Sequence, residues 1–142
     1  MAVLSMDVNY TSDEFRADLI SGLRKIKDKE GPYLVHCLEG KDRTGFVCML
    51  LEALAGASYD EIIDDYMETY ANYYGITRET KPEKYAAIKE NNIDYMLRFI
   101  AGGEETDPAK EDLKSASEKY LKDGGMEDEE IKLIQEKLCR MQ

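Results

Sequence analysis

The chain has 142 residues, a length that suits one domain built around a single core. Its 30 acidic and 19 basic residues give a net charge of −11, which repels nucleic acid and anionic membrane surfaces. Nucleic acid is therefore excluded as an expected partner, and any anion-binding role must rest on a local site. The longest apolar run, over residues 46–55 with Glu52 inside it, is about half of what a bilayer span needs, so we expect no membrane span.

Three cysteines, Cys37, Cys48 and Cys139, stand at wide and irregular spacing. No Cys-x-x-Cys pair indicates a zinc or redox site, and a reduced compartment is the simpler interpretation. The amino-terminal stretch MAVLSMDVNY lacks the basic region and long apolar run of a signal peptide. We therefore expect a cytoplasmic protein with no metal and no cofactor, in which Cys48 and Cys139 are core or neutral surface residues.

The first predicted element is an amphipathic helix over residues 12–29, which follows the capping sequence TSDE. A Gly-Pro turn ends it, and residues 33–36 then read as a short strand, apolar on both faces as parallel strands are. Nearly every position over residues 44–55 is apolar, which predicts a helix buried on all sides. A second, short strand is predicted at residues 3–5.

Helical patterns fill the rest of the chain, and they cover residues 58–75, 82–102, 107–124 and 127–140. The second of these patterns is expected to bend near Asn91 and Asn92. Asp107 and Pro108 predict an N-cap followed by proline at the first helical position. Residues 104–142 would form a helical tail on a single domain. The tyrosines at positions 66, 70, 73 and 74 fit core and helix-surface packing better than a substrate platform.

The balance of predicted strands and helices is unusual for a sheet protein. A strand as apolar as residues 33–36 needs sheet neighbours on both sides, and this chain offers at most one. Either the fold is mostly helical, or strands of the sheet precede Met1.

The stretch HCLEGKDRTG, residues 36–45, lies between the predicted strand and the buried helix. A loop that curls from a strand end into a helix start points successive backbone N–H groups at one spot, where the helix dipole adds positive potential. Gly40 suits a positive φ, and Gly45 allows the helix start to pack closely. Arg43 can bind two phosphate oxygens as a planar fork. The pattern predicts a phosphate-binding loop, and we call residues 36–45 the signature stretch.

Cys37 would lie at the centre of this loop, where the same donors stabilise its thiolate. Cysteines in such surroundings have pKa values of about 3.5–7.5, so the sulfur could attack phosphorus directly. Thr44 is placed to give a hydroxyl hydrogen bond to the sulfur. His36 is expected to orient the loop rather than to act as a base. A lone cysteine at a strand end is most often a small buried residue, but here it stands within a complete pattern.

The signature stretch resembles the motif His-Cys-x5-Arg-Ser/Thr-Gly of the protein tyrosine phosphatase superfamily. Within it, GKDRTG is most similar to the bacterial tyrosine and lipid phosphatases, and the downstream segments YDEIIDDYMETY and YLKDGGMEDEEIKLIQEKL are similar to the helical tail of that group. The resemblance implies hydrolysis of phosphotyrosine, phosphoserine/threonine or phosphoinositides through a cysteinyl-phosphate intermediate. It also implies an α/β fold with a parallel-sheet strand–loop–helix core and several carboxyl-terminal helices.

By this resemblance Cys37 is the nucleophile, Arg43 the phosphate clamp, Thr44 the hydroxyl that assists departure of the thiolate, and His36 a supporting residue. Lys41 would add positive charge for further phosphate groups or acidic substrates. The phosphate, or a sulfate or vanadate in its place, would be bound by the loop residues, which are Leu38, Glu39, Gly40, Lys41, Asp42 and Arg43.

The general acid has two candidates. Asp7 lies 30 residues before Cys37, near the spacing of the superfamily's acid loop, but it lacks the Trp-Pro-Asp form. Asp42 lies within the signature stretch and is the rival candidate in the bacterial group, and we favour it slightly.

Two other functions and one structural question accompany the phosphatase prediction. A catalytically weak phosphate-binding module, or pseudophosphatase, would keep the loop without turnover. A sulfur-transfer or arsenate-reducing enzyme also uses a cysteine loop that ends in arginine, but the His-Cys start and Arg-Thr-Gly end argue against it.

The chain resembles the carboxyl-terminal portion of a phosphatase domain. We therefore expect its sheet to be incomplete, and a strand-exchanged homo-oligomer or a complementary amino-terminal fragment to complete it.

Overall fold

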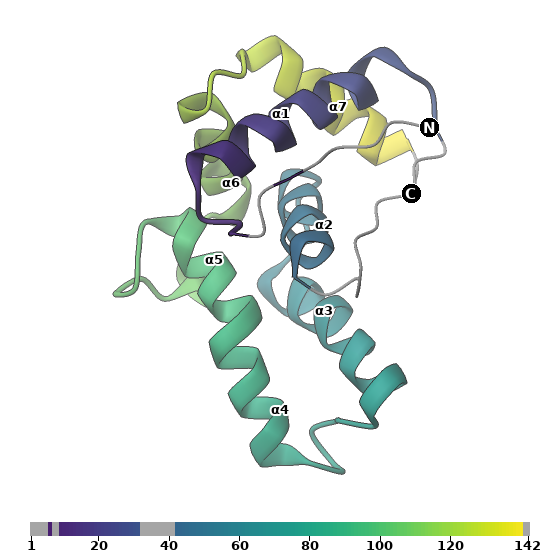
Figure 1. Cartoon of the computed structure of the whole chain (residues 1–142), viewed down its shortest axis with the longest axis vertical. Helices are drawn as coiled ribbons and strands as arrows, with labels where there is room; N and C mark the ends of the chain where they lie inside the picture. Colours follow the sequence, from purple (N-terminus) through teal and green to yellow (C-terminus); the bar gives the residue numbers. More distant parts are fainter. Residues whose placement is uncertain (1–5, 7–8, 32–41, 141–142) are drawn as a thin grey trace.

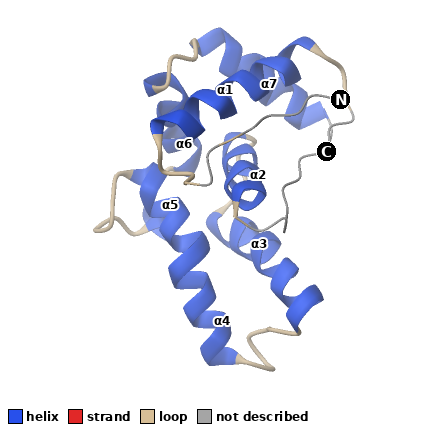
Figure 2. Ribbon diagram, viewed as in Figure 1, coloured by secondary structure: helices blue, strands red, loops and turns tan. Residues whose placement is uncertain are grey.

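The computed structural model describes residues 6, 9–31 and 42–140, and all regular structure within them is helical (Figure 2). The α-helices are α1 (Asp13–Asp28), α2 (Arg43–Leu54), α3 (Tyr59–Tyr74), α4 (Pro82–Ile88), α5 (Asp94–Ala101), α6 (Leu113–Asp123) and α7 (Asp128–Arg140). One π-helical turn, η1 (Lys89–Ile93), and one 3-10 turn, η2 (Pro108–Lys110), complete the set. Both predicted strands, residues 3–5 and 33–36, lie outside the described residues.

Helix α2 occupies the middle of the molecule (Figure 1). Helices α3 and α6 pack against it, while α1 and α7 lie side by side at one end. The segment α4–η1–α5 runs back beside α3 and ends against α6. The start of α2, where the signature stretch ends, is therefore held by a helical framework.

Aromatic packing around Phe46 anchors α2. Phe46 is fully buried, and its ring stacks on Tyr10 with centroids 5.1 Å apart. The rings of Phe15, on α1, and Tyr120, on α6, approach it edge-on at 5.5 and 5.7 Å. Phe99, on α5, lies 6.2 Å away. Aromatic pairs at such distances stabilise packing beyond the area that they bury, so three helices hold α2 through one residue.

Local signals set the ends of α1 and α3 as predicted. The hydroxyl oxygens of Ser12 and Ser58 accept hydrogen bonds from the backbone N–H groups of Phe15 and Glu61, at 3.0 and 3.2 Å. Gly75 closes α3 in the left-handed region with φ of 63°. These caps satisfy donors and acceptors that a helix end otherwise leaves unpaired.

The predicted bend at Asn91 and Asn92 is confirmed, and it takes the form of the π-helical turn η1. Beside this turn Asp94 is buried, and it accepts hydrogen bonds from Lys89 Nζ at 2.7 Å and from the Tyr59 hydroxyl at 2.6 Å. The buried carboxylate is thus paired and hydrogen-bonded, as such a charge must be. The network ties the bend to the start of α3.

The continuous helix predicted from Asp107 is wrong. Asp107 accepts a hydrogen bond from the Ala109 N–H and caps only the short turn η2, after which Glu111 is extended with φ −90° and ψ 155°. Asp112 then caps α6 through the Ser115 N–H. Two competing caps five residues apart divide the segment, because each carboxylate satisfies the donors of its own turn.

Side chains of α7 satisfy the carbonyl ends of two other helices. Lys137 Nζ donates to the carbonyl oxygens of Ile26 and Lys29, at 3.1 and 2.8 Å. Gln135 Nε2 donates to the carbonyl of Leu54 at 3.2 Å. A lysine at a helix carboxyl end also complements the dipole. The helical tail is therefore bonded to both α1 and α2.

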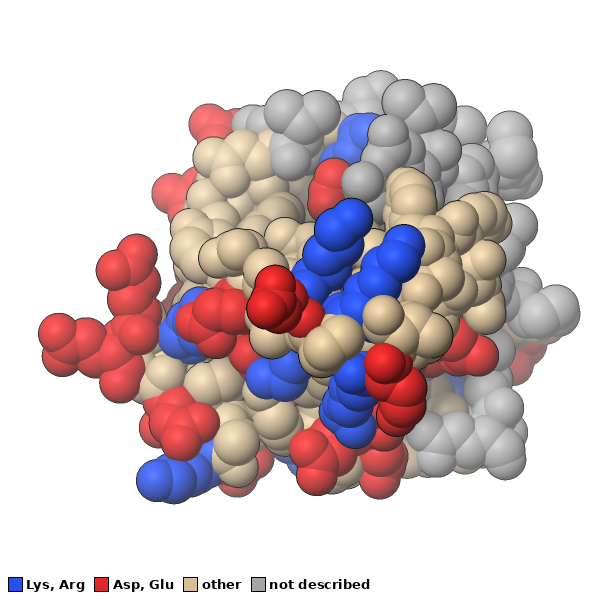
Figure 3. All heavy atoms as spheres, turned by 90° about the horizontal axis from the view of Figure 1, so that it is seen from below, with Lys and Arg blue, Asp and Glu red and all other residues tan. Residues whose placement is uncertain are grey.

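Acidic and basic side chains are interspersed on the face that Figure 3 shows, at the end of the molecule where α3 connects to α4. Among the described residues of that face, acidic side chains flank the basic ones. Within residues 9–31 and 42–140, no helix has both the length and the apolar character that crossing a bilayer requires.

Candidate active site at the start of α2

Three of the predicted site residues, Asp42, Arg43 and Thr44, lie in the described part of the chain, and they open α2 in succession. The other predicted residues lie outside it, and they are Asp7, His36, Cys37, Leu38, Glu39, Gly40 and Lys41. Their roles remain predictions from the sequence.

Asp42 occupies the N-cap position of α2, and its carbonyl accepts the Phe46 N–H at 2.9 Å. Its own φ and ψ are already helical, and its exposed carboxylate makes no capping hydrogen bond. No aspartate or glutamate follows within the first turn. Because the N–H groups of a first turn have no intrahelical partner, this helix start keeps backbone donors for an anion.

Arg43 is partly buried, and its Nη1 donates to the backbone carbonyl of Met6 at 3.4 Å. A guanidinium carries five N–H donors, and this contact uses one of them. Met6 immediately precedes Asp7 in the sequence, and the role of Asp7 stays a prediction. The side chain of Asp7 itself is not among the described residues.

Thr44 and Gly45 show how closely the start of α2 is packed. The Thr44 hydroxyl oxygen is buried and has no hydrogen-bond partner in the part of the chain that the structure describes. A Cβ atom on Gly45 would lie 2.8 Å from Cε2 of Tyr66, a distance that real side chains do not tolerate. The close packing predicted for Gly45 is confirmed, and its partner is the α3 ring of Tyr66.

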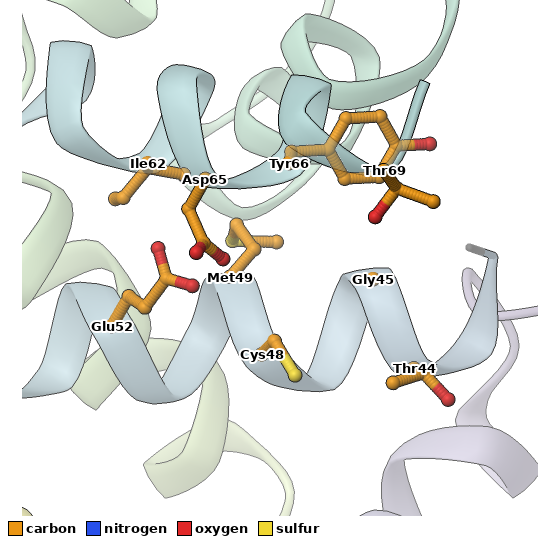
Figure 4. A pocket seen from close by; sticks show the side chains of 9 residues that line it. All are labelled: Thr44, Gly45, Cys48, Met49, Glu52, Ile62, Asp65, Tyr66 and Thr69. Atoms are coloured by element: carbon orange, nitrogen blue, oxygen red, sulfur yellow. The ribbon is translucent and has the colours of Figure 1, made fainter. Parts of the chain in front are cut away.

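A cavity of about 80 Å³ lies between α2 and α3, behind the signature stretch (Figure 4). Its lining includes Thr44, Cys48 and Tyr66, and two carboxyl groups, Glu52 and Asp65, face each other across it. Sequence reasoning missed this cavity. The signal in the sequence was Glu52, a single acidic residue within the apolar run of residues 46–55.

Glu52 is protonated more readily than an ordinary glutamate. Burial, the hydrogen bond with Asp65 and the charge of Asp65 raise the pKa of its carboxyl to about 9. The folded chain therefore holds a proton that the unfolded chain releases above about pH 4.5. The stabilisation is complete below that pH, and it is lost as the pH rises towards 9.

The variant Glu52→Gln is expected to remove this loss, because the amide is neutral at every pH in the window. We expect its melting temperature to exceed that of the wild type by about 2–5 °C at pH 9, and the difference to vanish near pH 5. Thermal unfolding followed by circular dichroism over this range measures the effect. The control is Glu68→Gln on the exposed face of α3. Parallel curves for wild type and Glu52→Gln would contradict the raised pKa of Glu52.

Arg43 and Thr44, the last two residues of the Cys-x5-Arg-Thr pattern, open α2, as the predicted phosphate-binding loop requires. The family model described as "Tyrosine phosphatase family" matches residues 5–140. The chain belongs to this family, which confirms the resemblance read from the signature stretch. The family fits a tyrosine phosphatase-like fold, to which the helices described above contribute the helical part.

Two curated relatives are similar to parts of the chain. Receptor-type tyrosine-protein phosphatase C of Homo sapiens is 28% identical over 100 residues, which cover 59% of this chain and 8% of that protein. A putative tyrosine-protein phosphatase of Cupriavidus necator is 50% identical over 36 residues, which cover 25% of this chain and 13% of that protein. The chain thus spans only a small share of either relative's length. No solved structure matches it.

Proposed function

We propose that this chain carries the catalytic loop of a cysteine-dependent phosphatase that hydrolyses phosphate monoesters. The observation that carries the proposal is the complete signature stretch, from which Arg43 and Thr44 continue into the first turn of α2, in a chain of the tyrosine phosphatase family. The backbone N–H groups of this helix start and the guanidinium of Arg43 supply the kinds of donor that a phosphate dianion needs.

The proposed reaction has two steps. The Cys37 thiolate attacks phosphorus, so that an S–P bond forms while the P–O bond to the leaving group breaks and an acid protonates the leaving oxygen. Water then attacks the phosphocysteine, inorganic phosphate leaves, and the thiolate is restored. Arg43 neutralises charge on the transferred group in both steps, and the Thr44 hydroxyl supports the departing thiolate.

We assign the general acid to Asp42, with Asp7 as the alternative. The Asp42 carboxylate is exposed and makes no capping hydrogen bond, so it is available to a leaving group beside the loop. The same group, once ionised, would act as the base for water in the second step.

For the substrate we propose phosphotyrosine, with phosphoserine/threonine and phosphoinositides as the alternatives that dual-specificity and lipid phosphatases of the similar bacterial group use. Lys41 would favour the more highly charged of these by adding positive charge beside Arg43. A panel of phosphopeptides and soluble phosphoinositides, compared by kcat/KM, separates the three classes.

The variant Cys37→Ser tests the proposed function. We expect the wild type to hydrolyse p-nitrophenyl phosphate, vanadate to inhibit it, and Cys37→Ser to lower kcat by about 10³-fold or more. The matched controls are Cys48→Ser, at the cavity between α2 and α3, and Cys139→Ser, on the exposed end of α7. Both should keep the turnover of the wild type. Undiminished turnover in Cys37→Ser would overturn the proposal.

A phosphate-binding module without turnover would give a different result on the same sample. Phosphate or vanadate would then raise the melting temperature of the wild type, while hydrolysis stayed at background. That combination would replace the enzyme by a pseudophosphatase.

A further inference from the structure

Four buried hydroxyl oxygens in the described part of the chain have no hydrogen-bond partner, and they belong to Thr44, Tyr66, Ser117 and Tyr120. Leaving a buried hydroxyl unpaired costs folding free energy, so each one calls for an explanation. Ser117 and Tyr120 lie on α6. Thr44 and Tyr66 come from two different helices, yet both border the cavity beside the start of α2.

The ring of Tyr66 fixes where its hydroxyl lies. Only 8% of the residue is exposed, and the ring rests on the backbone of Gly45, the last residue of the signature stretch. Figure 4 shows the ring above Gly45, with the hydroxyl directed along α2 towards its amino-terminal end. The donor therefore faces the end of the helix that carries Asp42, Arg43 and Thr44.

The neighbouring tyrosine on α3 behaves differently. The Tyr70 hydroxyl accepts a hydrogen bond from Asn92 Nδ2 at 3.0 Å, so its position is explained by packing against η1. The pKa of the Tyr66 hydroxyl is shifted by several neighbours. Burial raises the pKa of Tyr66 most, a hydrogen-bonding contact and charge interaction with Tyr70 and the charge of Asp42 raise it further, and a contact with Asn92 lowers it. The Tyr66 hydroxyl thus lies near Tyr70 and Asn92 without a hydrogen bond of ordinary length to either, and the carboxylate of Asp42 lies within electrostatic reach of it.

We propose that Tyr66 is a positioning residue, whose hydroxyl donates a hydrogen bond to the carboxyl group of Asp42 when a phosphate ester is bound. The inference rests on the proposed function and on Asp42 as its acid. One carboxyl oxygen accepts from Tyr66, and the other then carries the proton towards the leaving oxygen. Hydrogen bonds of this kind are often long or unformed in the free enzyme and tighten in the substrate complex.

The variant Tyr66→Phe removes the hydroxyl and keeps the ring on Gly45. An acid matters most when the leaving group is a poor one. We therefore expect kcat/KM for phenyl phosphate to fall about tenfold, and kcat/KM for 2,4-dinitrophenyl phosphate to stay within about twofold of the wild type. The melting temperature should stay the same or rise, because an unpaired buried hydroxyl has been removed.

Tyr120→Phe is the matched control. It also removes a buried, unpaired phenol hydroxyl, but its ring packs against Phe46 and Arg16 rather than against the signature stretch. Both esters should be hydrolysed at the rate of the wild type. A second test is the double variant of Asp42→Asn and Tyr66→Phe. Its kcat/KM should equal that of Asp42→Asn alone, because the carboxyl group that Tyr66 positions has already been removed.

Equal losses for the two esters, no loss for either, or a loss that adds to that of Asp42→Asn would each overturn the role of Tyr66. Those results leave the proposed function standing as long as wild-type turnover depends on Cys37. A wild type without turnover would overturn both proposals together.

Discussion

Arg43→Lys is expected to lower kcat/KM for aryl phosphates by about 10²–10³-fold, although the charge is kept. A lysine ammonium cannot bind two phosphate oxygens as a planar fork, and it is a compact charge on a flexible stem. Losing one fixed donor to the oxygens of a transition state costs a factor of this size in other enzymes. Steady-state kinetics with p-nitrophenyl phosphate measure the effect.

Arg78→Lys is the control for this substitution, since Arg78 is an exposed arginine that pairs with Asp64 at 3.4 Å. We expect it to leave kcat/KM unchanged. The contact between Arg43 and the Met6 carbonyl is long and partly exposed, so Arg43→Lys should change the melting temperature little. A variant that stays within threefold of the wild type would show that Arg43 does not clamp the transferred group.

Phe46→Ala is expected to destabilise the fold by about 3–5 kcal/mol, the largest loss of stability for a single substitution that we predict. Phe46 is fully buried, and its ring touches aromatic rings from α1, α5 and α6. The cavity left behind would be bordered by rigid rings that cannot collapse into it. Urea denaturation of wild type and variant gives the difference in the free energy of unfolding.

Because a loss of this size can exceed the stability of a small domain, Phe46→Leu serves as the second variant. It keeps most of the apolar volume, and we expect it to lose about 1–2 kcal/mol. Phe99→Ala, at a partly buried ring of the same cluster, should fall between these two. If Phe46→Ala lost less than Phe99→Ala, the cluster would not be centred on α2.

The helices could be predicted from the sequence because their boundaries depend on local chemistry. The hydroxyl of Ser58, the left-handed Gly75 and the run of apolar residues in α2 act over one or two turns, and the structure follows each of them. The helix predicted from Asp107 was wrong because a second cap, Asp112, competes with the first only five residues later. A pattern averaged over the whole segment does not resolve that competition.

Contacts between distant residues could not be predicted in the same way. The sequence indicates that Gly45 packs closely, but its partner, Tyr66, is 21 residues away and is chosen by the packing of α3 on α2. The carboxyl pair of Glu52 and Asp65 likewise depends on the distance between two helices. Helical periodicity places each side chain on a face, whereas the facing residue follows from the tertiary arrangement.

For the candidate site, the central residue could be predicted from the sequence, whereas its surroundings could be described only from the structure. Its central residue, Cys37, was predicted from the order of residue types in the signature stretch, and it lies outside the described residues. The structure adds the surroundings of the end of that stretch. They are Asp42, whose side chain makes no capping hydrogen bond, the partly buried Arg43, and the hydroxyls of Thr44 and Tyr66, which have no hydrogen-bond partner among the described residues. In the proposed mechanism, each of them gives a hydrogen-bonding group to the phosphate ester or to its acid.

The most direct measurement is to stop the wild-type reaction in acid during turnover of an aryl phosphate, and to locate any bound phosphoryl group by mass spectrometry of the digested chain. We predict a phosphoryl group on the peptide that contains Cys37, and none on the same peptide from Cys37→Ser. A phosphoryl group on Cys48 or Cys139, or turnover that persists in Cys37→Ser, would contradict a cysteinyl-phosphate intermediate at the signature stretch.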